Sequence, residues 1–303
     1  MSNSTLIRVA AMLLSTVIFL AMAPIAAQAS GETKIQVSVT FDAIKEFVKA
    51  VGGDLVDVSA IIPPGADPHN FEPKAQDLIR IGEARLFVYN GLGMEPWVDE
   101  AVQAAANESL MLLDASVGAD ALEDPDPEAV KEHGLYDPHL WLSLKGAKLE
   151  CGNIRDALIQ IDPSNKSAYE SNYDAFAAKL DALYDEYRPK FDSTTRKGIV
   201  IGHAAYGYLC REFGLEQNSV EDMFAEGEPN AQQMIEIIEY CKAKGVTTVF
   251  AETNVSPDVS RALAKEVGAI VYTIYTIESP EDGKDYLERM EYNLSNLYES
   301  LID

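Results

Sequence analysis

A long stretch without glycine, and without proline until Pro189, divides this sequence into two halves. Residues 164–190 carry aromatic and leucine side chains at spacings of three and four, and Ser164 stands where a helix N-cap is expected. We therefore predict a single helix of roughly 38 Å over 164–190. A helix of a coiled coil is the alternative, but the sequence holds only one such segment and so offers no partner helix. Because a helix resists bending more than a Gly/Ser linker does, the connection between the halves is predicted to be stiff.

Short β-rich runs alternate with helical patterns on both sides of this segment. The β-rich runs lie at 35–40, 56–62, 86–89, 110–113, 198–201, 246–251 and 270–275. The helical patterns lie at 41–51, 72–84, 203–213, 230–244 and 257–267. This order predicts an α/β fold with two lobes of mainly parallel sheet and covering helices, joined by one long rigid helix. The predicted domains are an N-terminal lobe at 30–163, the linking helix at 164–190 and a C-terminal lobe at 191–303.

Residues 1–29 are predicted to be a cleavable secretory signal. Arg8 is their one charged residue, an apolar run follows at 9–23, and the segment ends in Ala27-Gln28-Ala29. This order is typical of a signal peptide, and the apolar run is shorter than the roughly 20 residues that a membrane anchor needs. We therefore expect an exported, periplasmic protein.

The charge balance excludes some classes of partner. The chain holds 24 Lys and Arg against 49 Asp and Glu, a net charge of -25. Nucleic-acid phosphates and anionic membrane surfaces repel such a chain, so we expect no nucleic acid among its partners. An acidic surface also attracts cations, although a solvated acidic coat is the simpler interpretation.

The three cysteines have no C-x-x-C spacing that would indicate a metal or redox site. Cys210 and Cys241 lie in helical patterns of the same half and are a candidate disulfide. Buried free thiols, Cys151 included, are the alternative that we favour.

Three of the four histidines lie where predicted strands or turns end. His69 and His139 each close an Asp-Pro-His tripeptide, and His203 follows the β-rich run at 198–201. Ligand sites in open α/β sheets form beyond the carboxyl ends of the strands, so a site built from all three would lie between the lobes. Imidazole suits Zn, Cu, Fe and Ni. A single histidine at a turn is more often bonded to the main chain, but the repeated tripeptide weakens that interpretation.

Acids near these histidines are candidates for orienting the rings, because a carboxylate can accept the second N–H of a ligating imidazole. The candidates are Asp67, Glu72, Asp137 and Glu252.

Six ordered blocks of the sequence resemble the zinc/manganese ABC-transporter solute-binding protein family, the ZnuA/TroA-like cluster A-I. The blocks are Pro64–Pro73, Asn90–Trp97, Asp137–Leu142, His203–Leu215, Phe250–Val255 and Tyr286–Leu294. The resemblance implies metal ligands at His69, His139 and His203. A histidine in the third of these positions is similar to the zinc-type members, since Mn²⁺ favours oxygen ligands.

The sequence departs from the family pattern at the fourth ligand. Where relatives carry an Asp after the last strand, the ungapped match places Tyr275. The alternatives are water, Glu278, or His133 from the acidic loop at 123–133, and water or a loop residue is favoured. That loop holds one histidine where zinc-type relatives carry a histidine-rich stretch.

The resemblance implies a non-enzymatic, extracytoplasmic protein that captures a divalent transition metal between its lobes. Zn²⁺ is the expected metal, with Mn²⁺ less favoured, and the expected partner is the membrane permease of an ABC importer; we expect a monomer. An exported zinc hydrolase is one alternative, because three histidines and a water also describe a catalytic zinc centre. No H-E-x-x-H motif supports it. A Mn²⁺-binding or other metal-binding protein with an adhesin-like role is another alternative.

Overall fold

The computed structural model describes residues 34–123, 130, 134–221, 230–253 and 257–302. The predicted signal at 1–29 and His133 of the acidic loop lie outside the described residues. Among the described residues, no helix combines the length and the apolar composition needed to cross a bilayer.

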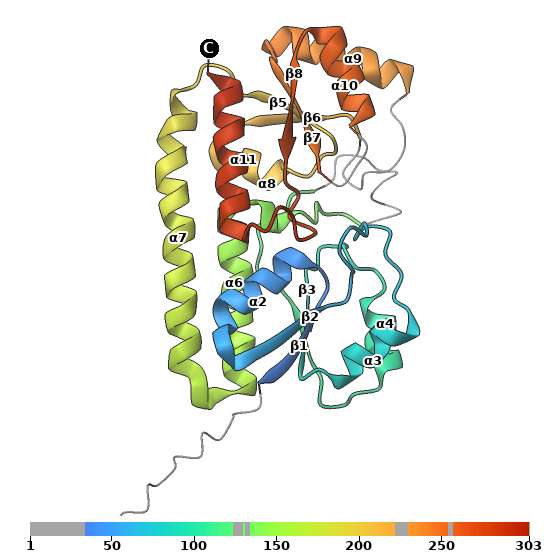
Figure 1. The fold of residues 1–303 in the computed structure, drawn as a ribbon, viewed down its shortest axis with the longest axis vertical. Helices are drawn as coiled ribbons and strands as arrows, with labels where there is room; N and C mark the ends of the chain where they lie inside the picture. The colour runs from blue at the N-terminus through green and yellow to red at the C-terminus, as the bar shows by residue number, and fades with distance from the viewer. Residues whose placement is uncertain (1–33, 124–129, 131–133, 222–229, 254–256, 303) are drawn as a thin grey trace, which may run out of the picture. The chain divides into compact units, whose positions relative to one another are not determined.

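The N-terminal lobe is built on a four-stranded parallel sheet with the strand order β2-β1-β3-β4 (Figure 1). The strands are β1 (Ile35–Val39), β2 (Val56–Ala60), β3 (Leu86–Tyr89) and β4 (Met111–Asp114). The helices α2 (Asp42–Gly52), α3 (Ala75–Glu83) and α4 (Val98–Ala105) separate them along the chain. The central strands β1 and β3 are mostly buried and apolar, as expected for a parallel sheet that helices cover on both faces.

The C-terminal lobe repeats this plan with the strand order β6-β5-β7-β8, again all parallel. Its elements are β5 (Gly198–Ile201), α8 (Gly207–Phe213), β6 (Glu216–Ser219), α9 (Ala231–Lys244), β7 (Thr248–Glu252), α10 (Asp258–Val267) and β8 (Ile270–Ile274). The sequence did not predict β6. Its four residues are all polar and none is fully buried, since it lies at the edge of the sheet. The predicted helix at 203–213 begins only at Gly207, because residues 203–206 form a turn.

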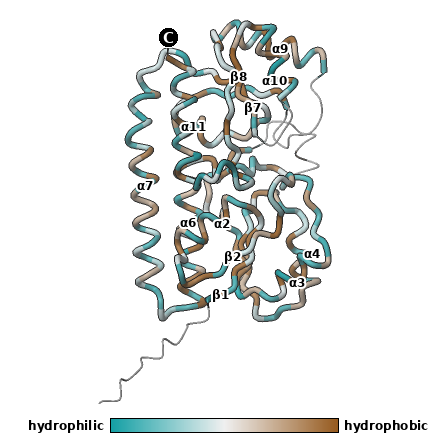
Figure 2. The backbone as a smooth tube through the Cα atoms, in the orientation of Figure 1, coloured by the Kyte–Doolittle hydropathy of each residue, from teal (hydrophilic) through white to brown (hydrophobic). Residues whose placement is uncertain are grey.

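The three further helices are α6 (Leu144–Ile161), α7 (Lys166–Ser193) and α11 (Tyr286–Leu301), and both α6 and α11 pack against α7. Figure 1 shows α7 running along both α6 and α11. The long helix was predicted at 164–190; it begins later, because Pro163–Asn165 forms a 3₁₀ turn, and it continues past Pro189. Figure 2 shows hydrophobic residues on α7 interspersed among hydrophilic ones, as expected for a helix with one packed side.

A single hydrophobic cluster connects the two sheets through these helices. It includes Val37 of β1, Ile154 of α6, Leu180 of α7, Leu294 of α11 and Ile274 of β8. A shared core opposes wide separation of the lobes, because opening would expose apolar surface to water. The two parallel sheets and the long helix confirm the predicted fold class.

The three cysteines are buried free thiols. The candidate disulfide between Cys210 and Cys241 is therefore absent, and the favoured interpretation is the one that the structure shows.

Candidate metal centre

His69, His139, His203 and Glu278 form a cluster in which the potential ligand atoms all lie within 4.8 Å of one another. The Nε2 atom of His139 is 3.2 Å from Nε2 of His69 and 3.2 Å from Nε2 of His203. His69 follows β2, His203 follows β5 and Glu278 follows β8. The structure thus brings together the three predicted histidines and one of the alternatives for the fourth ligand.

A buried carboxylate orients each of the two buried imidazole rings. Asp137 Oδ1 lies 2.9 Å from His139 Nδ1, and Glu252 Oε2 lies 2.7 Å from His203 Nδ1. When each carboxylate accepts the Nδ1 proton, Nε2 of the neutral ring carries a lone pair that points into the cluster. Two lone pairs 3.2 Å apart repel each other unless a proton or a cation lies between them. Adjacent nitrogens of a tetrahedral zinc site are about 3.3 Å apart, so this spacing suits a metal ion.

The two buried rings differ in charge. Burial, together with neighbouring His203, holds the pKa of His139 well below its usual value of 6.5, so this ring is neutral. Burial also disfavours a charge on His203, but the Glu252 carboxylate overcomes it and raises the pKa of His203 to about 9. The same pairing lowers the pKa of Glu252 despite its burial. The metal-free cluster therefore holds a proton on His203, and a metal ion must displace it.

Gly202, which precedes His203, leaves room for the Glu252 side chain to approach the main chain there. A Cβ atom at Gly202 would lie only 2.8 Å from Glu252 Oε1. That oxygen accepts the main-chain N–H of His203 at 2.9 Å, while the other carboxylate oxygen contacts the ring. A side chain at Gly202 would disturb both bonds.

Glu278 completes the cluster, and the main chain around it is bound to the N-terminal lobe. Glu278 O accepts from Asp42 N at 3.2 Å, and Thr276 O accepts from Trp141 Nε1 at 2.8 Å. Buried Ile277 has φ 60°, a strained conformation for a β-branched residue, so the surrounding packing holds this segment in place. Burial raises the pKa of Glu278 to about 7, against the opposing effect of His203.

Tyr275 does not belong to the cluster. Its hydroxyl bonds to Asp282, and its main-chain N–H donates to Asn293 Oδ1 at 2.9 Å. The chain turns after β8, so Glu278, the third residue after Tyr275, is the one that reaches the histidines. The structure therefore places Glu278, one of the alternatives from the sequence, beside the histidines, and the preference for water or a loop residue stays a prediction.

The four predicted outer acids differ in burial, since Asp137 and Glu252 are buried whereas Asp67 and Glu72 are exposed. Asp67 is exposed and accepts from the main-chain N–H of His69 at 2.9 Å and from Asn70 Nδ2 at 3.0 Å. Glu72 is also exposed and lies outside the cluster of ligand atoms. Asp137 and Glu252 each contact the Nδ1 atom of a buried imidazole ring.

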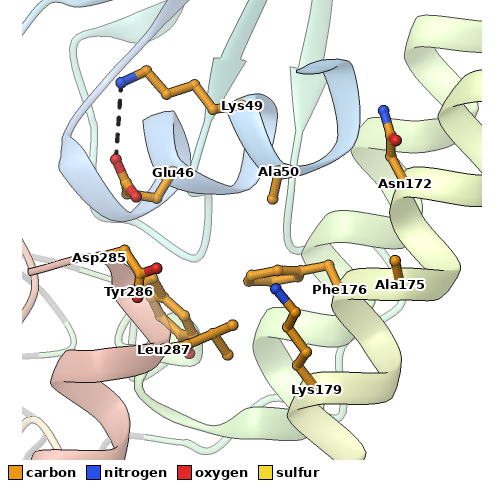
Figure 3. A pocket seen from close by; sticks show the side chains of 10 residues that line it. All are labelled: Glu46, Lys49, Ala50, Asn172, Ala175, Phe176, Lys179, Asp285, Tyr286 and Leu287. Carbon is orange, nitrogen blue, oxygen red and sulfur yellow. Dashed lines mark ion pairs between the residues drawn. The ribbon is translucent and has the colours of Figure 1, made fainter. Parts of the chain in front are cut away.

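A separate cavity of about 370 Å³ lies among α2, α7 and α11 (Figure 3). Lys49 and Glu46, 3.9 Å apart, approach it from α2, Lys179 from α7, and Asp285 lies just before α11. Its described lining contains no histidine and no cysteine, so this cavity is distinct from the metal cluster.

The chain is similar to known proteins over most of its length. A family model described as zinc-uptake complex component A, periplasmic, matches residues 37–300. A putative metal-binding protein of Treponema pallidum is 41% identical over 94% of each chain. The high-affinity zinc uptake system protein ZnuA of Bacillus subtilis is 33% identical, over 89% of this chain and 88% of that protein.

Solved structures show the same fold. A crystal structure of ZnuA matches with a TM-score of 0.79 at 31% identity, over 89% of this chain and 100% of that one. A laminin-binding protein of Streptococcus agalactiae, described as bifunctional with adhesin and metal transporting activity, matches with a TM-score of 0.81 at 34% identity. That match covers 89% of this chain and 100% of the other.

Proposed function

The chain belongs to the zinc/manganese solute-binding proteins of ABC transporters, and from that premise we propose that it captures Zn²⁺ between its lobes and delivers it to a membrane permease. The observation that carries this proposal is the convergence of three imidazole nitrogens and one carboxylate from four separate segments. We also propose that it acts in the periplasm, which the predicted signal peptide at 1–29 supports, and that it acts as a monomer.

The proposed ligands are Nε2 of His69, His139 and His203 and a carboxylate oxygen of Glu278. Three nitrogens and one oxygen suit tetrahedral Zn²⁺, whereas Mn²⁺ prefers sites richer in oxygen. Asp137 and Glu252 supply negative charge just outside these ligands, which offsets the charge of the bound dication.

We propose binding rather than catalysis, because Glu278 offers a fourth side-chain ligand where a catalytic zinc keeps a position open for water. The hydrolase alternative is tested with ester and peptide substrates on the zinc-loaded protein. Turnover that disappears in His203→Ala would favour the hydrolase. Saturable binding of the chain to immobilised laminin would favour an adhesin-like role.

Isothermal titration of the metal-free mature chain with Zn²⁺ tests the proposal. We expect one tightly bound Zn²⁺ per chain and loss of this binding in His139→Ala. An unchanged affinity in that variant would contradict the proposed site.

A matched pair of variants tests the fourth ligand. Glu278→Gln is expected to weaken zinc binding. His133→Ala removes another candidate for the fourth ligand and is expected to leave the zinc affinity unchanged. The opposite result would assign the fourth ligand to the acidic loop.

A further inference from the structure

The short helix α8 of the C-terminal lobe is bonded along one side to the chain that carries His139. Tyr208, Arg211 and Glu212 share this side, because residues three and four apart are neighbours on a helix. Arg211 Nη2 donates to Asp120 O at 2.7 Å. Glu212 Oε2 accepts the main-chain N–H of the first residue of α6 at 2.9 Å. The helix therefore contacts the segments on both sides of His139.

The hydroxyl of Tyr208 lies at the centre of this contact. It donates to Asp137 O at 2.7 Å and accepts from Leu122 N at 3.2 Å. Leu122 and Asp137 are in turn joined, since Asp137 N donates to Leu122 O at 2.9 Å. Tyr208 is 1% exposed, so water does not compete for these bonds. One buried hydroxyl thus fixes the main chain of the acid that orients His139.

Gly207, one residue earlier, approaches the side chain of the same acid. A Cβ atom at Gly207 would lie 2.7 Å from Asp137 Oδ2. The other oxygen, Oδ1, accepts from the main-chain N–H and contacts Nδ1 of His139, each at 2.9 Å. Asp137 is therefore held by α8 on one side and by His139 on the other.

We propose that Tyr208 and Gly207 are positioning residues of the metal centre, acting on His139 through Asp137. They connect the two lobes, because α8 follows closely after His203 while Asp137 precedes His139. A binding site needs its ligands within about 0.5 Å of the productive geometry, and a contact of this kind holds them there. This inference rests on the proposed function, since it assigns α8 to the geometry of the proposed zinc site.

Tyr208→Phe in the full mature chain, loaded with Co²⁺ in place of Zn²⁺, tests the role of the hydroxyl. The visible absorption of Co²⁺ reports its coordination geometry, which a purely structural role of Tyr208 would leave unchanged. We expect altered band positions and intensities, with a zinc Kd raised about tenfold or more. Tyr240→Phe is the control, because its hydroxyl also donates to a main-chain carbonyl, Glu216 O at 3.1 Å, but within the C-terminal lobe.

Gly207→Ala tests the same positioning role through the carboxylate of Asp137. It replaces Tyr208→Phe as the test if that variant does not fold. Alanine favours the helix, and its Cβ atom would lie nearest to Asp137 Oδ2, with Leu122 Cδ1 at 3.1 Å and Gln217 Nε2 at 3.4 Å. We expect the same kind of spectral change and a raised zinc Kd. Spectra and Kd values equal to those of the parent chain in the folded variants would overturn the inference, even if the unfolding temperature fell. Failure of the parent chain to bind zinc would instead overturn the proposed function.

Discussion

The tripeptide Asp-Pro-His occurs twice, and its two copies have different environments. In both copies Oδ1 of the Asp accepts a hydrogen bond from the main-chain N–H of the histidine at 2.9 Å. In the second copy the same oxygen of Asp137 also contacts the ring of His139. In the first copy the other oxygen of Asp67 accepts from Asn70 instead. Asp137 is buried, whereas Asp67 is exposed.

This difference separates what a local sequence determines from what the fold adds. An Asx turn follows from the tripeptide itself, because the Asp side chain bonds to the main chain two residues on. The orientation of the His139 ring depends on burial and on α8, which lies far away in the sequence. Burial also raises the pKa of Asp137 to about 7. We therefore expect the buried side of the cluster to be sensitive to mutation and the exposed turn to be tolerant.

The largest difference is expected between His203→Ala and His69→Ala in the metal-free protein. Removing His203 leaves Glu252 buried without its partner, which should lower the free energy of unfolding by about 3–5 kcal/mol at pH 7. Removing the partly exposed His69 should cost about 1 kcal/mol or less. Urea unfolding with a chelator present measures both values. Equal losses would show that the two sides of the cluster do not differ in stability.

Asp137→Ala is expected to weaken zinc binding about 10–100-fold, because the ring of His139 loses the acceptor that fixes its tautomer and direction. Isothermal titration gives the Kd, and circular dichroism verifies that the variant folds. An affinity within twofold of the parent chain would show that packing alone orients His139.

The sequence predicted that the three histidines come together, because each follows a strand or a turn that local patterns reveal. His203, for example, follows a β-rich run whose bounds the structure reproduces at Gly198–Ile201. The same patterns predicted no difference between Asp137 and Asp67, either in burial or in role. Burial depends on which segments of the other lobe pack there, and α8 is far from Asp137 along the chain.

Glu278 was harder to predict for a related reason. Its position depends on the turn after β8, where Ile277 takes a conformation that its residue type disfavours. Bonds from the N-terminal lobe, such as Trp141 Nε1 to Thr276 O, hold that turn. A strained turn of this kind has no local signature, so the ungapped match placed Tyr275, and not Glu278, at the position of the relatives' Asp.

Zinc affinity is expected to fall by about tenfold per pH unit as the pH decreases from 8 to 7, and more steeply below pH 7. Zn²⁺ must displace the proton of His203, whose pKa is raised to about 9, so one proton is released throughout this range. Glu278 and Asp137, whose pKa values are both raised to about 7, add further protons at the acidic end. His139 is already neutral and adds none. Titrations in buffers of different ionisation enthalpy count the protons, and a pH-independent affinity would contradict these assignments.

The smallest effect is expected for Asp67→Ala, the counterpart of Asp137→Ala in the exposed turn. Both variants remove the acceptor for the main-chain N–H of a histidine, so a difference between them reports what burial and the contact with the His139 ring add at Asp137. We expect the zinc Kd to change by about threefold or less, because solvent screens the charge of exposed Asp67. Two small effects also oppose each other. Loss of this negative charge weakens attraction of the dication, but it makes Glu278 easier to ionise. A loss of affinity equal to that of Asp137→Ala would mean that the tripeptide, rather than its burial, sets the strength of the site.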